Sequence, residues 1–340
     1  MREVLRRGRQ LACTLLGHAT RAMKSSAPGI EAVDARASSF MEEGIRLMKF
    51  ENDAGAALLY FNRALALRRR LPTEVPIHAY GLAACWLNRA EALTRLDPAK
   101  HAMALRAYGE ALALLRPLPL GADSRFSRRL AIALQNRALL LVAQTPPATA
   151  DAIAALTEAI AVLDQADAMG AAERNYLLAF IWMNLANVQV SEATIASDLA
   201  AREAARRALA LVQDFEHEDA TAAEVGLKSR DVLCQVAGRR LSTQAEREMV
   251  MADIHEATDL VDEALGLVRE WEQRGIVRFR NLASELCRFG ARVYAFYQPH
   301  FLPEFLSEQL DPRQSARSYI QSREMQDAVR EIASLLPTSR

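Results

Sequence analysis

The sequence is poor in the residues that interrupt helices. Only 14 Gly and 12 Pro occur among 340 residues, whereas Ala is the most frequent residue type. Alanine has the highest intrinsic helix propensity, and Gly and Pro are the strongest local breakers of regular structure. The composition therefore predicts an all-α protein.

An excess of charge and a long apolar run are also missing. The 42 basic side chains balance the 42 acidic ones, so the formal net charge is zero. Binding to nucleic acid or to an acidic membrane as a general activity needs an excess of Lys and Arg. No apolar run reaches the roughly 18 residues of a membrane span. We expect a cytoplasmic protein with no nucleic-acid partner and no transmembrane segment.

Residue patterns typical of catalysis or metal binding are absent. The cysteines Cys13, Cys85, Cys234 and Cys287 are far apart and form no Cys-x-x-Cys pair, which argues against a zinc site and a disulfide framework. The six histidines form no His-Glu-x-x-His motif, and there is no nucleophile elbow or phosphate-binding glycine loop. The sequence therefore predicts a protein that is not an enzyme, with no cofactor and no metal.

The amino-terminal residues carry a local positive charge. Residues 1–24 hold six basic side chains and one acidic side chain, a net charge of +5 (six minus one). We interpret residues 1–30 as a loosely ordered basic extension. A secretory signal and a basic helix lying on an anionic surface stay open as alternatives.

A repeat of about 48 residues runs through the chain, and a fixed period of this kind is the sequence signature of a stacked-repeat architecture. Three segments share an Asn-x-Ala motif, and their alanines Ala90, Ala138 and Ala186 are evenly spaced. A large apolar residue stands four positions before each small one, so the two lie on the same face of a helix. With three more degenerate copies the pairs are Phe40 and Gly44, Trp86 and Ala90, Leu134 and Ala138, Trp182 and Ala186, Leu233 and Ala237, and Phe279 and Ala283.

A second series of small residues alternates with the first. Each copy has two alanines seven residues apart, and in most copies a bulky residue lies between them. The copies are Ala57-Phe61-Ala64, Ala104-Tyr108-Ala111, Ala152-Leu156-Ala159, Ala201-Ala205-Ala208 and Ala257-Val261-Ala264. Alanines at fixed positions let neighbouring helices approach closely, and we expect them at helix–helix contacts.

The two series alternate, which predicts about six antiparallel helical hairpins. One hairpin cannot bury its own apolar stripe, so the hairpins must stack into a continuous core. Asp97-Pro98 offers a cap and a first-turn Pro for one second helix. We expect hairpins over about 31–72, 76–118, 124–167, 171–216, 222–273 and 274–298, followed by a capping segment over 299–340.

At these residues the chain resembles the tetratricopeptide repeat family. The family pattern is Trp-x2-Leu-Gly-x2-Tyr in the first helix and Ala-x3-Phe in the second. Trp182-x2-Leu185-Ala186 is similar to the first part, and Ala57-x3-Phe61 and Ala104-x3-Tyr108 match the second. The resemblance covers about residues 31–298. Because the family period is usually about 34 residues, this chain would be a long-repeat variant.

The resemblance implies a right-handed α-α superhelix whose concave groove holds a peptide or helix of another protein. The chain would then be a non-enzymatic scaffold or adaptor. Amide side chains suit this role, because each can donate to and accept from a peptide backbone. An alternative is that these amides only tie hairpins together. The expected groove residues are Asn88, Glu91, Asn136, Asn184, Asn187, Arg280 and Asn281.

Other functions stay open or are disfavoured. Co-chaperone relatives hold a terminal carboxylate with cationic side chains, and at the matching positions this chain has Met41, Ile45 and Ile132. A regulatory module that senses a small molecule or signalling peptide is the alternative to the scaffold. Seven of the 21 aromatic residues lie between Phe279 and Phe305, which predicts either a cap or a self-association surface.

Overall fold

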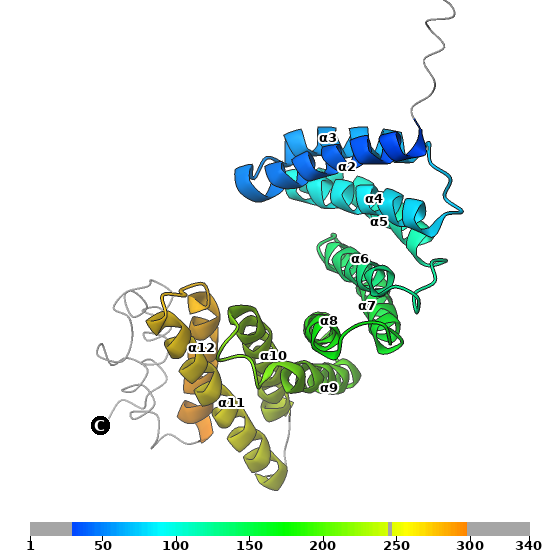
Figure 1. Cartoon of the computed structure of the whole chain (residues 1–340). Coiled ribbons are helices and arrows are strands. Elements are labelled where there is room, and N and C mark those ends of the chain that lie inside the picture. Colours follow the sequence, from blue (N-terminus) through cyan, green and yellow to red (C-terminus); the bar gives the residue numbers. More distant parts are fainter. Residues whose placement is uncertain (1–28, 244–246, 298–340) are drawn as a thin grey trace, which may run out of the picture. The chain divides into compact units, whose positions relative to one another are not determined.

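The computed structural model describes residues 29–243 and 247–297, and within them every regular element is helical (Figure 1). The helices pack in sequence order as hairpins, which confirms the prediction of an all-α solenoid. The predicted extension up to residue 28 and the predicted capping segment lie outside the described residues. The chain divides into two compact units, Met1–Leu118 and Pro119–Arg340, which are considered separately below.

The first unit contains two helical hairpins. Each helix packs on the next along the chain, α2 on α3, α3 on α4 and α4 on α5. Its elements are α2 (Ile30–Arg46), the π-helical turn η1 (Leu47–Glu51), α3 (Ala54–Arg68), α4 (Pro76–Leu96), the 3-10 turn η2 (Pro98–Lys100) and α5 (His101–Leu115).

The second unit continues the same pattern. Besides the contacts between consecutive helices, α8 touches both α6 and α10, and α10 touches α12, so the first helices of successive hairpins pack on each other. The helices are α6 (Ser124–Val142), α7 (Thr149–Asp164), α8 (Ala171–Ser191), α9 (Ile195–Val212), α10 (Ala220–Thr243), α11 (Arg247–Gln273) and α12 (Arg280–Tyr297).

Local capping residues set several helix boundaries. Asp97 Oδ1 accepts from the Ala99 backbone N–H at 2.8 Å, and Pro98 opens the short turn η2 before α5, as Asp97-Pro98 predicts. At the end of η1, Asn52 takes the left-handed conformation with φ of 51°. The next residue, Asp53, caps α3 through a 2.8 Å bond from the Ala56 N–H. These two residues turn the chain within the first hairpin.

The alanines of the second helices are the helix–helix contacts that the repeat predicts. All ten have an exposed fraction of 0%, which confirms the prediction. Ala has no side-chain rotamers to restrict, so its burial costs little conformational entropy. The bulky residues between the pairs, including Phe61 and Leu156, are also buried. The ten alanines are Ala57, Ala64, Ala104, Ala111, Ala152, Ala159, Ala201, Ala208, Ala257 and Ala264.

Gly44 allows the closest approach of the first hairpin. A Cβ added at Gly44 would lie 2.4 Å from Cε1 of Phe61, closer than two carbon atoms pack. The corresponding positions of the next two first helices hold the buried Ala90 and Ala138. The missing methyl group at Gly44 thus makes room for the phenyl ring of Phe61 on α3.

Two arginines each bridge three helices. Arg68 on α3 donates to Asp34 Oδ1 and Ser38 Oγ of α2 at 3.1 and 2.9 Å, and to the Gly81 carbonyl of α4 at 2.8 Å. Arg239 on α10 donates to Asp198 on α9 and to the Val190 carbonyl of α8. The planar guanidinium presents several donors at once, which suits a junction between helices.

Candidate functional site

Two of the predicted groove amides are hydrogen-bonded within their own helix. Asn88 Nδ2 on α4 donates to the Ala84 carbonyl at 3.1 Å, and Asn187 Nδ2 on α8 donates to the Met183 carbonyl at 3.0 Å. Neither bond reaches another hairpin. Their Nδ2 groups thus already have an intrahelical acceptor.

Two other predicted amides form no such bond. Asn136 on α6 is half-buried, and Asn184 on α8 is 8% exposed. Neither side chain has a hydrogen-bond partner within the described part of the chain. They are one repeat apart and occupy the same position of two first helices that contact each other. Both amides therefore keep donors and acceptors for a further group.

The remaining predicted site residues differ in environment. Glu91 pairs with Arg95 one turn later at 2.5 Å, an exposed pair on α4. Arg280 donates to the buried Glu272 at 2.8 Å, which ties the start of α12 to the end of α11. Asn281 is exposed. Asn88 and Glu91 thus lie in the first unit, and the other five predicted residues lie in the second.

The aromatic residues of the carboxyl-terminal region are core residues as far as their side chains are described. Phe279 and Tyr294 are buried, and Phe289 packs partly buried against the same apolar cluster. Trp271 and Leu286 belong to this cluster too. Phe301 and Phe305, on which the predicted self-association surface also depends, lie outside the described residues. The described rings thus support the packing of α10, α11 and α12.

A cluster of arginines stacked on aromatic rings lies on α2, α3 and α4 of the first unit. Arg63 stacks on both Phe40 and Tyr60, with Cζ 5.9 and 5.4 Å from the ring centroids, and the two rings are 6.2 Å apart. Arg36 also lies over Phe40 at 5.9 Å. We call this the Arg-aromatic surface, and its residues are Arg36, Phe40, Tyr60, Arg63, Arg69, Trp86 and Arg89.

Trp86 carries two guanidinium groups. Arg69 lies 4.8 Å and Arg89 lies 5.4 Å from the centroid of its ring. Arg89 also donates to Asn62 Oδ1 at 3.0 Å. Burial, followed by the nearby charge of Arg69, lowers the pKa of Arg89 from its ordinary value. Burial is the larger cause and the like charge of Arg69 the smaller one, so two guanidinium groups lie close together at this ring.

The arginines of the Arg-aromatic surface have no carboxylate partner in the part of the chain that the structure describes. The stacked arginines Arg207 and Arg274 of the second unit do have one. Arg207 stacks on Trp182 at 4.8 Å and pairs with Glu203 at 2.7 Å. Arg274 stacks on Trp271 at 4.9 Å and pairs with Glu270 at 2.5 Å. Arginines thus stack on aromatic rings in both units, whereas the arginines of the Arg-aromatic surface in the first unit have no carboxylate beside them among the described residues.

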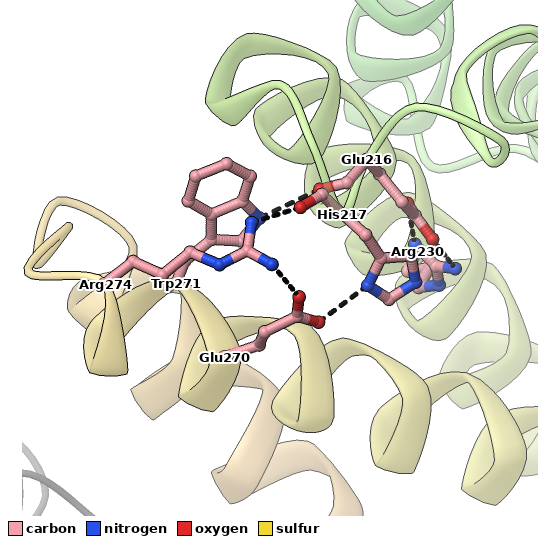
Figure 2. Close-up of polar contacts among 6 residues, drawn as sticks. All are labelled: Glu216, His217, Arg230, Glu270, Trp271 and Arg274. Carbon is pink, nitrogen blue, oxygen red and sulfur yellow. Dashed lines mark hydrogen bonds and ion pairs between the residues drawn. The ribbon is translucent and has the colours of Figure 1, made fainter.

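A buried polar network joins the connection between α9 and α10 to α11 (Figure 2). Arg230 donates to both carboxylate oxygens of Glu216 at 2.7 and 2.8 Å, and the indole N–H of Trp271 donates to the Glu216 carbonyl at 2.9 Å. Burial opposes the charge of Arg230, but the hydrogen bonds and charge of Glu216 outweigh it and raise the Arg230 pKa. At its exposed edge His217 Nδ1 lies 2.6 Å from Glu270. Its buried charged groups, Arg230 and Glu216, bind each other, which indicates a structural role.

The described thiols are buried. Among the described residues, Cys85, Cys234 and Cys287 are in no disulfide bond, and burial raises the pKa of Cys234 and raises that of Cys287 to about 12. Residues 29–243 and 247–297 contain no group of three acidic, His or Cys side chains that could hold a metal ion. Among the described helices, none has both the length and the hydropathy needed to cross a membrane.

Sequence reasoning did not find the Arg-aromatic surface. Its rings come from three helices, and periodicity assigns Phe40 and Trp86 to the core. The available signals were the consecutive Arg68, Arg69 and Arg70 and the Trp86-x2-Arg89 spacing, which puts a guanidinium one turn from an indole. Neither signal says that the charges stay uncompensated, because that depends on which acids neighbouring helices supply.

Comparisons with known proteins support the fold. No protein-family model matches the chain, and no curated protein matches it. Among solved structures it is similar to BtubC (BKLC) from P. vanneervenii, with a TM-score of 0.51 and 14% identity, over 85% of this chain and 95% of that one. At this identity the similarity concerns the fold alone. The chain has a helical-repeat all-α fold of the kind seen in that structure.

Proposed function

We propose that this protein is a non-enzymatic scaffold or adaptor that binds a peptide or helix of another protein. In this proposal the hairpins are long tetratricopeptide-like repeats, and the first helices line the binding face. The packing of α6, α8, α10 and α12 on one another supports it, because such packing places equivalent residues of successive hairpins near each other.

The observation that carries the proposal is the state of Asn136 and Asn184. Both amides occupy the same repeat position on touching helices and have no hydrogen-bond partner among the described residues. Neither amide is among the buried side-chain atoms without a hydrogen-bond partner, so their polar atoms are open to water and to a ligand. A partner's backbone N–H and C=O groups would satisfy such amides in pairs.

A cytoplasmic location is part of the proposal. Among the described residues, Cys85, Cys234 and Cys287 are in no disulfide bond. Disulfides are rare in the reducing cytosol, so cysteines outside disulfides fit that compartment.

Affinity purification from the source organism tests the proposal. The bait is the full chain as wild type, as Asn136→Ala with Asn184→Ala, and as Asn88→Ala. Because the amide donor of Asn88 already bonds within its own helix, Asn88→Ala is the matched control. We expect wild type and control to retain a common set of partners that the double variant loses.

Recovery of the same partners by all three baits would overturn the role of the two amides. Recovery of no partner by wild type would overturn the scaffold itself and favour the sensor alternative. Matching circular-dichroism melts for the three chains are required, so that a lost partner reports lost contacts and not lost folding.

A further inference from the structure

We propose that the Arg-aromatic surface of the first unit binds an acidic segment of a partner protein, with Arg69 and Arg89 binding its carboxylates. This inference rests on the proposed function, because it takes the partner to be a polypeptide. It adds the chemistry of that partner and a second contact surface, separate from Asn136 and Asn184.

Trp86 is the centre of the surface. Two guanidiniums lie over it at 4.8 and 5.4 Å, one from the end of α3 and one from α4. Stacking on a ring covers the planar side of a guanidinium but leaves its N–H donors at the edge available. Arg69 is exposed and Arg89 is half-buried, so a carboxylate can approach both. Stacking on the ring orders the two guanidinium groups before a ligand binds, which reduces the conformational entropy lost on binding.

The charge of the surface calls for an anionic ligand. Arg36, Arg63, Arg69 and Arg89 add four positive charges over α2, α3 and α4, and none pairs with an acid in the described residues. The chain as a whole is neutral, so this concentration of unpaired charge is local. The Arg on Trp182 of the second unit is neutralised by Glu203, although Trp182 occupies the same repeat position as Trp86.

A peptide fits the surface better than a nucleic acid. Binding of single-stranded nucleic acid uses aromatic rings on which bases stack. Here Phe40, Tyr60 and Trp86 are all half-buried and each already carries at least one guanidinium. Carboxylates need only the edges of the guanidiniums, where bidentate hydrogen bonds form. The partly buried rings beside them offer contact to the apolar side chains of the same peptide.

Fluorescence anisotropy of the purified full chain tests the inference. The first probe is a short fluorescein-labelled peptide of alternating Glu and Ser. The second is the same peptide with Gln in place of Glu, and the third is a labelled oligothymidylate. The protein variants are Arg69→Gln with Arg89→Gln, and Arg207→Gln as the matched control. Arg207 also stacks on a Trp but has its own carboxylate.

We expect the Glu peptide to bind wild type and the Arg207→Gln control with similar Kd. The double variant should bind about tenfold more weakly, because two exposed charge contacts are lost. The Gln peptide should not bind, and added salt should weaken the binding of the Glu peptide by screening. All substituted residues are exposed or half-buried, and equal melting temperatures will confirm intact folding.

Three results would overturn the inference. They are equal binding of the Glu peptide to wild type and double variant, tighter binding of oligothymidylate than of the Glu peptide, and no binding of the Glu peptide at all. None of them affects the proposed function, which depends on partners lost with Asn136 and Asn184. Conversely, if the affinity purification recovers no partner, the proposed function fails, but the anisotropy experiment still measures whether the Arg-aromatic surface binds an acidic peptide.

Discussion

Arg230 binds Glu216 through two hydrogen bonds of 2.7 and 2.8 Å, and the two side chains are buried, with only 6% and 5% of their surface exposed. Gly226 lies one turn before Arg230, and a Cβ there would stand 2.2 Å from the Glu216 carboxylate. A glycine in a helix is unfavourable, yet here it makes room for the ion pair.

Removing Glu216 should destabilise the second unit strongly. Glu216→Ala removes the buried counter-ion of Arg230 and leaves only the exposed Glu263 beside it, and we expect a loss of about 3 kcal/mol in the free energy of unfolding. Urea unfolding followed by tryptophan fluorescence measures it. Glu263→Ala is the control, because Glu263 also contacts Arg230 at 3.2 Å but is 59% exposed. It should cost less than about 1 kcal/mol, and equal losses would contradict a buried-pair role.

Gly44→Ala should destabilise the first unit despite the higher helix propensity of Ala. The new methyl group would meet the buried Phe61 ring, and overpacking costs about 1–3 kcal/mol. Gly109→Ala on α5 meets nothing within 4 Å, so it should stabilise the protein by about 0.5–1 kcal/mol. Thermal unfolding of both variants checks the opposite signs. A stabilising Gly44→Ala would show that Phe61 moves freely.

The alanine positions should tolerate no larger residue. Ala159 and Ala161 lie on the same helix, α7, but Ala159 is fully buried and Ala161 is exposed. We expect Ala159→Leu to lower the free energy of unfolding by about 1–3 kcal/mol or more. Ala161→Leu should change it by less than about 0.5 kcal/mol. Denaturant titrations of the pair measure both, and similar values would refute close helix contact at Ala159.

Asp219 should give α10 an acid-sensitive cap. Its Oδ1 accepts from the Thr221 and Ala222 N–H groups at 2.6 and 3.1 Å, and these bonds, that from Ala222 foremost, lower the Asp219 pKa. A lowered folded pKa adds stability above the unfolded value of about 3.9, and this stability is lost as pH falls through the folded value.

At neutral pH, Asp219→Ala should therefore cost about 1 kcal/mol, and the difference from wild type should shrink as pH falls below the unfolded value of about 3.9. Asp219→Asn keeps an acceptor oxygen but cannot titrate, so it distinguishes the effect of the capping hydrogen bond from the effect of the negative charge. Melting temperatures of the three chains across this pH range provide the test. A pH-independent difference between wild type and Asp219→Ala would mean that the ionised form contributes nothing.

The fold was predictable because its main signal is local and periodic. Ala104 and Ala111 are two turns apart on one helix face, and the same spacing returns in every second helix. Close helix packing requires small residues at such positions, so spacing alone predicts both the helices and their burial. The break between the two compact units has no such signal.

The candidate site was predictable only in part. Repeat position alone assigned Asn88 and Asn136 to the same role, yet Asn88 bonds to its own helix and Asn136 does not. That choice depends on local packing, which spacing does not encode. Likewise, Glu216 lies in a connection, and only the folded chain brings it to Arg230.

Arg68 has a consequence for how the first unit opens. Its bonds to Asp34, Ser38 and the Gly81 carbonyl join both hairpins, so detaching α2 would take Asp34 and Ser38 away from an arginine that is only 11% exposed. Fraying of the end hairpin alone, common in repeat arrays, is therefore disfavoured. The backbone amides of α2, α3 and α4 should exchange with deuterium at a shared, slow rate, as a single cooperative unit.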